Sequence, residues 1–248
     1  MKAFILAAGL GTRLKPLTDF KPKALIELNG IPLIEIIIKR LIKYDFKEII
    51  INVHHYADQI IKFLEKNNYF NIEIKISDER ELLLDTGGGL KKASWFFDDN
   101  QPFLIHNVDI ISNINLKEFY EYHKSQNSVI TIAVQKRNSS RYFLFDSENY
   151  LCGWENIKTG EVKIVRNPSG PISKYAFSGI HTVTPIVFKN FPDKDVFSII
   201  DFYLTLASKY KISFYEHNNN FFFDLGKKEN LIEAEKFITK TNFIKELI

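Results

Sequence analysis

The chain has 248 residues, 45% of them hydrophobic, and its 22 phenylalanines supply a bulky core, so a disordered chain is excluded. Its 33 basic and 30 acidic residues are scattered rather than massed in runs, which argues against an extended nucleic-acid-binding surface. The single cysteine, Cys152, excludes an intramolecular disulfide and fits a reducing compartment, where we expect it to be a small buried residue.

The first predicted element is a strand, KAFILAA, at the N-terminus. Its apolar run is too short for a secretory leader, and Gly9, Gly11 and Arg13 follow it at once. We therefore expect a cytoplasmic protein without a signal peptide and without a membrane partner.

Helical and strand patterns then alternate along the chain, which is typical of βαβ units with a mostly parallel sheet. The isoleucines at 36–38 leave a strand open as an alternative for the first helix. The predicted order is helix 32–45, strand 47–53, helix 56–67, strand 71–77, helix 87–97, strand 101–109, helix 115–125 and strand 128–135.

From residue 137 the pattern changes to short apolar segments separated by turns, which predicts an antiparallel extension over about 137–183. Two helices follow, at 197–210 and 227–240. No linker-like stretch interrupts the chain, so we expect one domain, 1–248, of the α/β class.

The loop after the first strand, GLGTRL, is the first candidate for a binding site. Leu14 stands where a dinucleotide fingerprint needs its third glycine, and no Gly-Lys-Ser/Thr follows Gly9 at Walker spacing. What remains is a glycine loop with two cations, Arg13 and Lys23. Backbone amides and an arginine can wrap a polyphosphate, so the loop predicts phosphate binding rather than a solvated surface turn.

The stretch LAAGLGTRLKPLTDFKPKAL resembles the signature of the sugar-1-phosphate nucleotidyltransferases. LLLDTGGGLKKA, FLIHNVDI, KYAFSGIHTV and FFFDLGKKENL agree with the same family, in order, over nearly the whole chain. The resemblance implies a Rossmann-like, three-layer α/β/α fold of the GT-A-like type. It is strongest to the short bacterial-type members that act on N-acetylmuramate 1-phosphate or mannose 1-phosphate and lack a C-terminal β-helix.

The resemblance also implies the reaction, in which a nucleoside triphosphate and a sugar 1-phosphate give a nucleoside diphosphate sugar and pyrophosphate. UTP is favoured, while GTP or CTP with mannose, heptose or glucose 1-phosphate, and a catalytically silent regulatory protein, stay open. In-line attack on the α-phosphorus needs charge neutralisation, for which Arg13 and Lys23 are the candidates. The sequence does not determine the oligomeric state, and a homodimer is compatible with it.

Mg²⁺ is the expected cofactor, because it prefers oxygen ligands from one or two carboxylates together with phosphates. Asp109 and Asp224 each end a predicted strand, and parallel packing would bring both to one rim. They are also the family's metal pair by position. Each alone could instead cap a turn.

The resemblance assigns further residues to the two substrates. The catalytic set is Arg13, Lys23 and Asp109. The sugar-binding set is Asn107, Asn156, Ser178 and Gly179. The nucleotide-binding set is Ala8, Gly9, Gly11, Thr12, Arg13, Lys23, Glu79, Thr86, Gly87 and Gly88, with Glu79 or Glu81 facing the edge of the base.

One position departs from the family, because Val108 stands where glycine usually precedes the first metal aspartate. A β-branched residue adopts φ > 0 only with difficulty, so the sugar contact at this point could differ. We expect His54 and His55 to be structural, Phe221 to Phe223 to form a fully buried strand, and residues 95–97 to be a helix end packed in the core.

Overall fold

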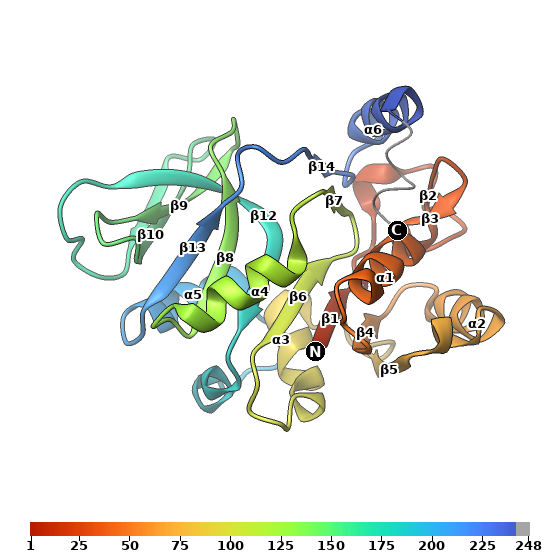
Figure 1. The fold of residues 1–248 in the computed structure, drawn as a ribbon, viewed down its shortest axis with the longest axis horizontal. Coiled ribbons are helices and arrows are strands. Elements are labelled where there is room, and N and C mark those ends of the chain that lie inside the picture. The colour runs from red at the N-terminus through yellow and green to blue at the C-terminus, as the bar shows by residue number, and fades with distance from the viewer. Residues whose placement is uncertain (242–248) are drawn as a thin grey trace. The chain divides into compact units, whose positions relative to one another are not determined.

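The computed structural model describes residues 1–241, which divide into two compact units (Figure 1). Unit 1 comprises residues 1–83, 106–116 and the described residues from 221 onward, and unit 2 comprises 84–105 and 117–220. Each unit is therefore built from separate stretches of the chain. The expectation of a single domain stays a prediction.

Unit 1 is built on three parallel strands, β1 (Lys2–Leu6), β4 (Glu48–Val53) and β5 (Glu73–Asp78). The crossover helices are α1 (Leu33–Lys43) and α2 (Ala57–Lys66), red to orange in Figure 1. The predicted helix is confirmed and the strand alternative for residues 36–38 is wrong, since these isoleucines are buried within α1. In β4, Ile49, Ile50 and Ile51 have no exposed surface, as a central parallel strand requires.

Further elements of unit 1 come from three parts of the chain. Near the N-terminus two short strands, β2 (Glu27–Leu28) and β3 (Ile31–Pro32), pair with each other. In the middle, β6 (Phe103–Asn107) enters the unit with its last two residues and is followed by β7 (Ile110–Ser112). At the end of the described chain are β14 (Phe222–Asp224) and α6 (Lys228–Thr241).

The pairing of β14 corrects one expectation about the late strand FFFD. It runs antiparallel to β7, with Asp224 opposite Ile110, instead of joining a parallel sheet. Phe221 to Phe223 are half-buried rather than fully buried. In a two-stranded ribbon each strand has only one neighbour, so its side chains are less covered than those of a central strand.

Unit 2 contains the antiparallel strands and three helices. The helices are α3 (Asp85–Ala93), α4 (Leu116–Ser125) and α5 (Ile199–Ala207). The strands are β8 (Ile130–Gln135), β9 (Arg141–Phe145), β10 (Leu151–Asn156), β11 (Glu161–Ile164), β12 (Ser173–Val183) and β13 (Ile212–Glu216).

The pairing within unit 2 is mixed. β8 pairs parallel with β13 and antiparallel with β12, and β9, β10 and β11 continue antiparallel from β12. The α/β class with parallel strands and an antiparallel addition is thereby confirmed. β12 contains a bulge between Phe177 and His181, where Gly179 has a positive φ of 68°.

Two side-chain expectations have opposite outcomes. Cys152 is buried, as expected. Trp95 is 58% exposed, whereas Phe96 and Phe97 are buried, so the expected core packing is wrong for the tryptophan. α3 ends at Ala93, and the single 3₁₀ turn after it turns Trp95 outward. Within residues 1–241, no helix is both long and apolar enough to cross a membrane.

Candidate active site

The start of the glycine loop, just after β1, is held by hydrogen bonds to the neighbouring strand β4. The Oδ1 atom of Asn52, near the end of β4, accepts hydrogen bonds from the backbone N–H groups of Ala7 (2.7 Å) and Ala8 (3.3 Å). The N–H of Ala8, predicted to bind nucleotide, is therefore already used within the protein. Gly9 is exposed, and no other atom lies within 4 Å of the position that a Cβ would occupy.

The other end of the loop is held at Gly11, which has φ of 66°. A Cβ at Gly11 would lie 2.8 Å from Cγ2 of Thr18 and 3.2 Å from Cβ of Lys23, so only glycine permits this approach. Thr18 also donates from Oγ1 to the carbonyl oxygen of Gly11 at 2.9 Å. This contact brings Lys23 next to the loop, while Thr12 and Arg13 are exposed in the short 3₁₀ turn Thr12–Leu14.

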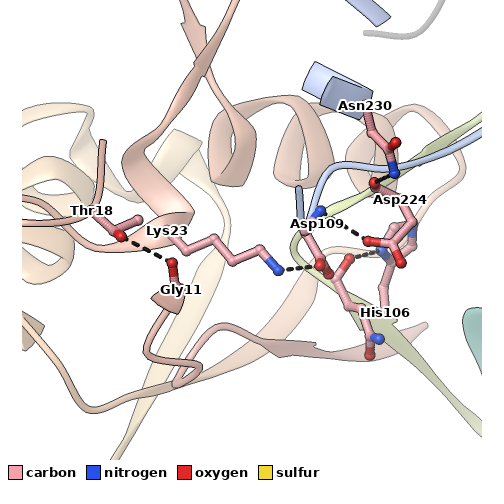
Figure 2. Close-up of polar contacts among 9 residues, drawn as sticks. Gly11, Thr18, Lys23, His106, Asp109, Asp224 and Asn230 are labelled. Carbon is pink, nitrogen blue, oxygen red and sulfur yellow. Dashed lines mark hydrogen bonds and ion pairs between the residues drawn. The ribbon is translucent and has the colours of Figure 1, made fainter. Parts of the chain in front are cut away.

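Lys23 and Asp109 form an ion pair through Nζ and Oδ2, visible at the centre of Figure 2. Both side chains are 13% exposed, so the pair is largely withdrawn from water yet still accessible. Asp109 lies in the turn between β6 and β7. A cation and a carboxylate that are both partly desolvated interact more strongly than an exposed pair.

Asp224 is brought to Asp109 by the antiparallel ribbon. The N–H of Leu225 donates to the carbonyl oxygen of Asp109 at 2.8 Å, next to the β7–β14 pairing. The backbone carbonyl oxygen of Asp224 accepts a hydrogen bond from Nδ2 of Asn230 at 2.6 Å, which ties the end of β14 to α6 (Figure 2). The two carboxylates share a rim, as predicted, but through antiparallel pairing.

Gly226 marks the point on which the charged groups converge. A Cβ placed on it would lie 2.7 Å from Nη2 of Arg13, 2.8 Å from Oδ1 of Asp224 and 3.2 Å from Oδ2 of Asp109. Its N–H donates to Oδ1 of Asp224 at 2.9 Å. Sequence reasoning missed Gly226, although the motif FFFDLGKKENL, which was matched to the family, contains it.

These donors fit a magnesium ion. Mg²⁺ is usually held by one or two carboxylates, with the remaining positions filled by phosphate oxygens and water. Asp109 and Asp224 supply such a pair, and residues 1–241 contain no group of three His, Cys, Asp or Glu side chains that would form a complete protein cage.

Two buried basic residues, His106 and Arg40, make hydrogen bonds to the backbone on either side of Asp109. Burial and the nearby Arg40 guanidinium lower the pKa of His106 to about 3, so its imidazole is neutral. Its Nδ1 donates to the carbonyl oxygen of Asn107 at 2.8 Å. Burial also lowers the pKa of Arg40 to about 10, and its Nη2 donates to the carbonyl oxygen of Ile114. The hydrogen bond of Arg40 therefore ties the segment that follows Asp109 to α1.

Val108 does not have the positive φ that its glycine-like position suggested. It is buried, and its N–H donates to the carbonyl oxygen of Leu6 at 3.2 Å. The backbone before Asp109 is thus compatible with a β-branched residue, and the half-buried Asn107 precedes it at the end of β6.

Glu79 does not have the position expected of a base contact. Its side chain has no exposed surface, and Oε1 accepts from Nδ2 of Asn52 at 2.8 Å. Glu81, the alternative, is exposed. The expectation of a direct base contact is therefore corrected for Glu79, because a fully buried carboxylate cannot reach a ligand without leaving its partner.

In unit 2 the glycines that open α3 serve a different contact from the one predicted. The N–H groups of Gly87 and Gly88 donate to the carbonyl oxygen of Phe197 at 2.9 and 3.2 Å. A Cβ on Gly88 would lie 1.9 Å from the carbonyl oxygen of Asp195. These amides are thus used by residues 195–197 and not left bare for a base. Thr86 is half-buried and accepts from the N–H of Ile199 at 3.0 Å.

The predicted sugar-binding residues of unit 2 lie on β10 and β12. Asn156 is half-buried at the end of β10, and its Oδ1 accepts from the N–H of Lys158 at 3.1 Å. Ser178 is buried and its hydroxyl meets Nε2 of His217 at 2.8 Å. Gly179 is in the bulge of β12, a feature often found beside ligand sites.

Glu155, next to Asn156, is a candidate that sequence reasoning missed. It is 8% exposed, and its Oε2 pairs with Nζ of Lys174 at 2.8 Å. Its Oε1 is buried without a hydrogen-bond partner among the described residues. A buried carboxylate oxygen with no donor is unfavourable unless a ligand supplies one. The signal in the sequence was a lone acid within the otherwise apolar strand LCGW.

Comparisons with known proteins show the family and the fold. A family model described as nucleotidyl transferase matches residues 2–241. The N-acetylmuramate alpha-1-phosphate uridylyltransferase of Caulobacter vibrioides is 30% identical over 214 residues, which cover 83% of this chain and 84% of that protein. The mannose-1-phosphate guanyltransferase of Hypocrea jecorina is 39% identical over 138 residues, which cover 55% of this chain but only 38% of that protein.

Solved structures are similar in fold at low sequence identity. HddC from Yersinia pseudotuberculosis, complexed with GMP-PN, superposes with a TM-score of 0.73 at 24% identity, over 95% of this chain and 99% of that one. The inositol-1-phosphate CTP transferase from T. maritima gives a TM-score of 0.76 at 16% identity, over 99% of this chain and 96% of that one.

Proposed function

Because the chain belongs to the nucleotidyl transferase family, we propose that it transfers a uridylyl group from UTP to a sugar 1-phosphate. The preferred acceptor is N-acetylmuramate 1-phosphate or a similar sugar phosphate. The products are a UDP-sugar and pyrophosphate. The substrates are thus a nucleoside triphosphate and a sugar phosphate.

The observation that carries the proposal is the convergence of Arg13, Asp109 and Asp224 on Gly226, with Lys23 paired to Asp109. Two cations and two carboxylates at one rim match the needs of phosphoryl chemistry, where charge must be neutralised on several oxygens at once. A catalytically silent protein would have no need of all four groups.

The chain's own residues act mainly by positioning. The anionic oxygen of the sugar 1-phosphate attacks the α-phosphorus, the new P–O bond forms, and the bond to the β-phosphate oxygen breaks with its electrons leaving on pyrophosphate. Lys23, released from Asp109, places a compact charge on the α-phosphate or the sugar phosphate, and Arg13 binds the departing pyrophosphate bidentately. Neither step needs a proton to be removed from the nucleophile.

Asp109 and Asp224 would hold a magnesium ion through their carboxylates. When bound, the ion would neutralise the phosphate oxygens and orient the triphosphate. In the structure this carboxylate of Asp109 pairs with Lys23, so a Lys23 that binds phosphate would leave the carboxylate of Asp109 available to the ion.

The choice of UTP is supported by the share of each relative that is matched. The Caulobacter uridylyltransferase is similar over 84% of its length, whereas the match to the Hypocrea guanyltransferase covers 38% of that protein. Base choice depends on a few contacts, so GTP and CTP are competing outcomes of the test. A cytoplasmic location is a further prediction from the sequence, whereas a homodimer is only compatible with it.

The test is pyrophosphate release with Mg²⁺, for the four common ribonucleoside triphosphates against a panel of sugar 1-phosphates that includes N-acetylmuramate 1-phosphate. We expect release with UTP and one sugar phosphate, and a fall in kcat of at least about 100-fold for Lys23→Ala and for Asp109→Asn. Lys21→Ala is the matched control, since Lys21 lies in the same loop and pairs with Glu27 at 3.9 Å.

Removal of divalent ions tests the carboxylate pair separately. Dialysis against EDTA should abolish release, and added Mg²⁺ should restore it in the wild type but not in Asp224→Asn at the same concentration. Nucleotide binding without pyrophosphate release from any pair would favour the regulatory alternative. Release that survives EDTA would contradict the assigned role of Asp109 and Asp224.

A further inference from the structure

Asn52 is a buried polar residue in an otherwise apolar strand. Ile49, Ile50 and Ile51 of β4 have no exposed surface, and Asn52, which follows them, is only 2% exposed. In register it lies between Leu6 of β1 and Ser77 of β5, in the middle of the parallel sheet of unit 1. A buried carboxamide is unfavourable unless its donors and acceptors are paired, so its hydrogen bonds require an explanation.

Those hydrogen bonds join three segments at the carboxyl end of the sheet. Oδ1 accepts from the N–H groups of Ala7 at 2.7 Å and Ala8 at 3.3 Å, just after β1. Nδ2 donates to Oε1 of Glu79 at 2.8 Å, just after β5. The orientation of the amide follows from its partners, since N–H groups need an acceptor and a carboxylate needs a donor.

Glu79 is itself held firmly by its backbone. Its N–H donates to the carbonyl oxygen of Val53 at 2.8 Å, and its carbonyl oxygen accepts from Nδ1 of His54 at 2.7 Å. With no exposed surface, its carboxylate faces the protein interior. Glu79 therefore provides a fixed point to which Asn52 is anchored.

We propose that Asn52 and Glu79 are positioning residues for the phosphate-binding loop, acting through the backbone of Ala7 and Ala8. By turning these two N–H groups back toward β4, Asn52 sets the point at which the chain leaves the sheet. The far end of the loop is set by Thr18, which donates to the carbonyl oxygen of Gly11 at 2.9 Å. The short span between these two anchors is what faces the triphosphate. The inference rests on the proposed function.

A purely structural role predicts something different from a positioning role. If the bonds only stabilised the sheet, their loss would lower the melting temperature without a preference between the two substrates. If they position the loop, their loss weakens nucleotide binding specifically, because the loop binds phosphates through fixed backbone groups. Binding of the sugar 1-phosphate, measured as its KM, changes much less.

The variants separate these cases. Asn52→Leu removes both functions of the amide. Asn52→Asp keeps an oxygen toward Ala7 and Ala8 but sets a second carboxylate against Glu79, which is unfavourable. The double variant Asn52→Asp/Glu79→Gln reverses the donor and the acceptor and so restores the bond. Ser77→Ala is the matched control. Ser77 is buried next to Asn52 on the neighbouring strand β5, and its hydroxyl has no hydrogen-bond partner among the described residues.

Three measurements are made on the full-length protein: UTP affinity by calorimetry, KM for the sugar 1-phosphate, and hydrogen exchange of the amides of residues 6–12. For Asn52→Leu and Asn52→Asp we expect a UTP Kd raised about tenfold and amide protection at Ala7 and Ala8 reduced by a similar factor. The double variant should return to within about threefold of the wild type, and Ser77→Ala should match the wild type.

Two results would overturn the proposal. One is unchanged exchange at Ala7 and Ala8 in Asn52→Leu. The other is a double variant that keeps the wild-type melting temperature but binds UTP as weakly as Asn52→Asp. If the wild type itself bound no UTP, the choice of nucleotide would fail, and the exchange measurement would still decide on the anchoring of the loop.

Discussion

Gly226 is a residue at which a single added carbon would directly displace charged groups of the candidate active site. A Cβ there would lie within 3.2 Å of Arg13, Asp224 and Asp109 together, so Gly226→Ala must displace at least one of them. Misplacement of a catalytic group by about 1 Å can cost about 100-fold in rate, and we expect a fall in kcat of that order. The measurement is steady-state kinetics, beside the melting temperature of the same variant.

Gly160→Ala is the control for Gly226→Ala. Gly160 has φ of 73° with no other atom within 4 Å of the Cβ position, in an exposed turn. Its substitution should lower stability by about 1 kcal/mol without lowering kcat. Equal losses of kcat in both variants would point to general destabilisation and against a special role for Gly226.

At the scale of elements, α4 is attached to its unit by a buried histidine. His123 meets Oγ1 of Thr131 at 2.8 Å and Oγ1 of Thr184 at 3.1 Å, and burial lowers its pKa to about 4. The unfolded state, with a pKa near 6.5, therefore binds a proton that the folded state does not. The free energy of unfolding should fall as the pH drops from about 6.5 to 4, by about 1.4 kcal/mol per pH unit for this proton.

The pH effect can be assigned by substitution. His123→Gln keeps hydrogen-bonding groups but cannot titrate, so urea unfolding between pH 4 and 6.5 should show a shallower pH dependence than the wild type. His106, with a pKa lowered to about 3, should account for a further part of the wild-type slope. A variant with the full wild-type slope would show that His123 is not the group that binds the proton.

At the scale of the whole molecule, the chain crosses between the two units four times, after residues 83, 105, 116 and 220. Neither unit is a continuous segment, so a fragment such as 84–220 would contain 106–116 without the rest of unit 1. We expect one cooperative thermal transition, with equal calorimetric and van 't Hoff enthalpies, in line with a single domain. Two separate transitions in differential scanning calorimetry would contradict that prediction.

The sequence was most informative where local chemistry and spacing carry the signal. The glycine loop, its two cations and the alternation of strands and helices could all be predicted, because each depends on residues close together in the chain. It was least informative about contacts made across the fold. Glu79 was expected to contact the nucleotide base, but its carboxylate is buried and accepts a hydrogen bond from Asn52. Gly87 and Gly88 were assigned to the nucleotide, but the carbonyl oxygen of Phe197 takes their amides.

By itself, then, the sequence determined the α/β class, and it predicted that the first loop binds phosphate and that Arg13, Lys23, Asp109 and Asp224 are the candidate site residues. Only the tertiary structure decided how Asp224 reaches Asp109, through the antiparallel pairing of β14 with β7, and that Gly226 lies between them and Arg13. The physical reason is that strand direction and close approach depend on pairing between segments more than 100 residues apart, such as Asp109 and Leu225. Local sequence patterns do not encode such pairing.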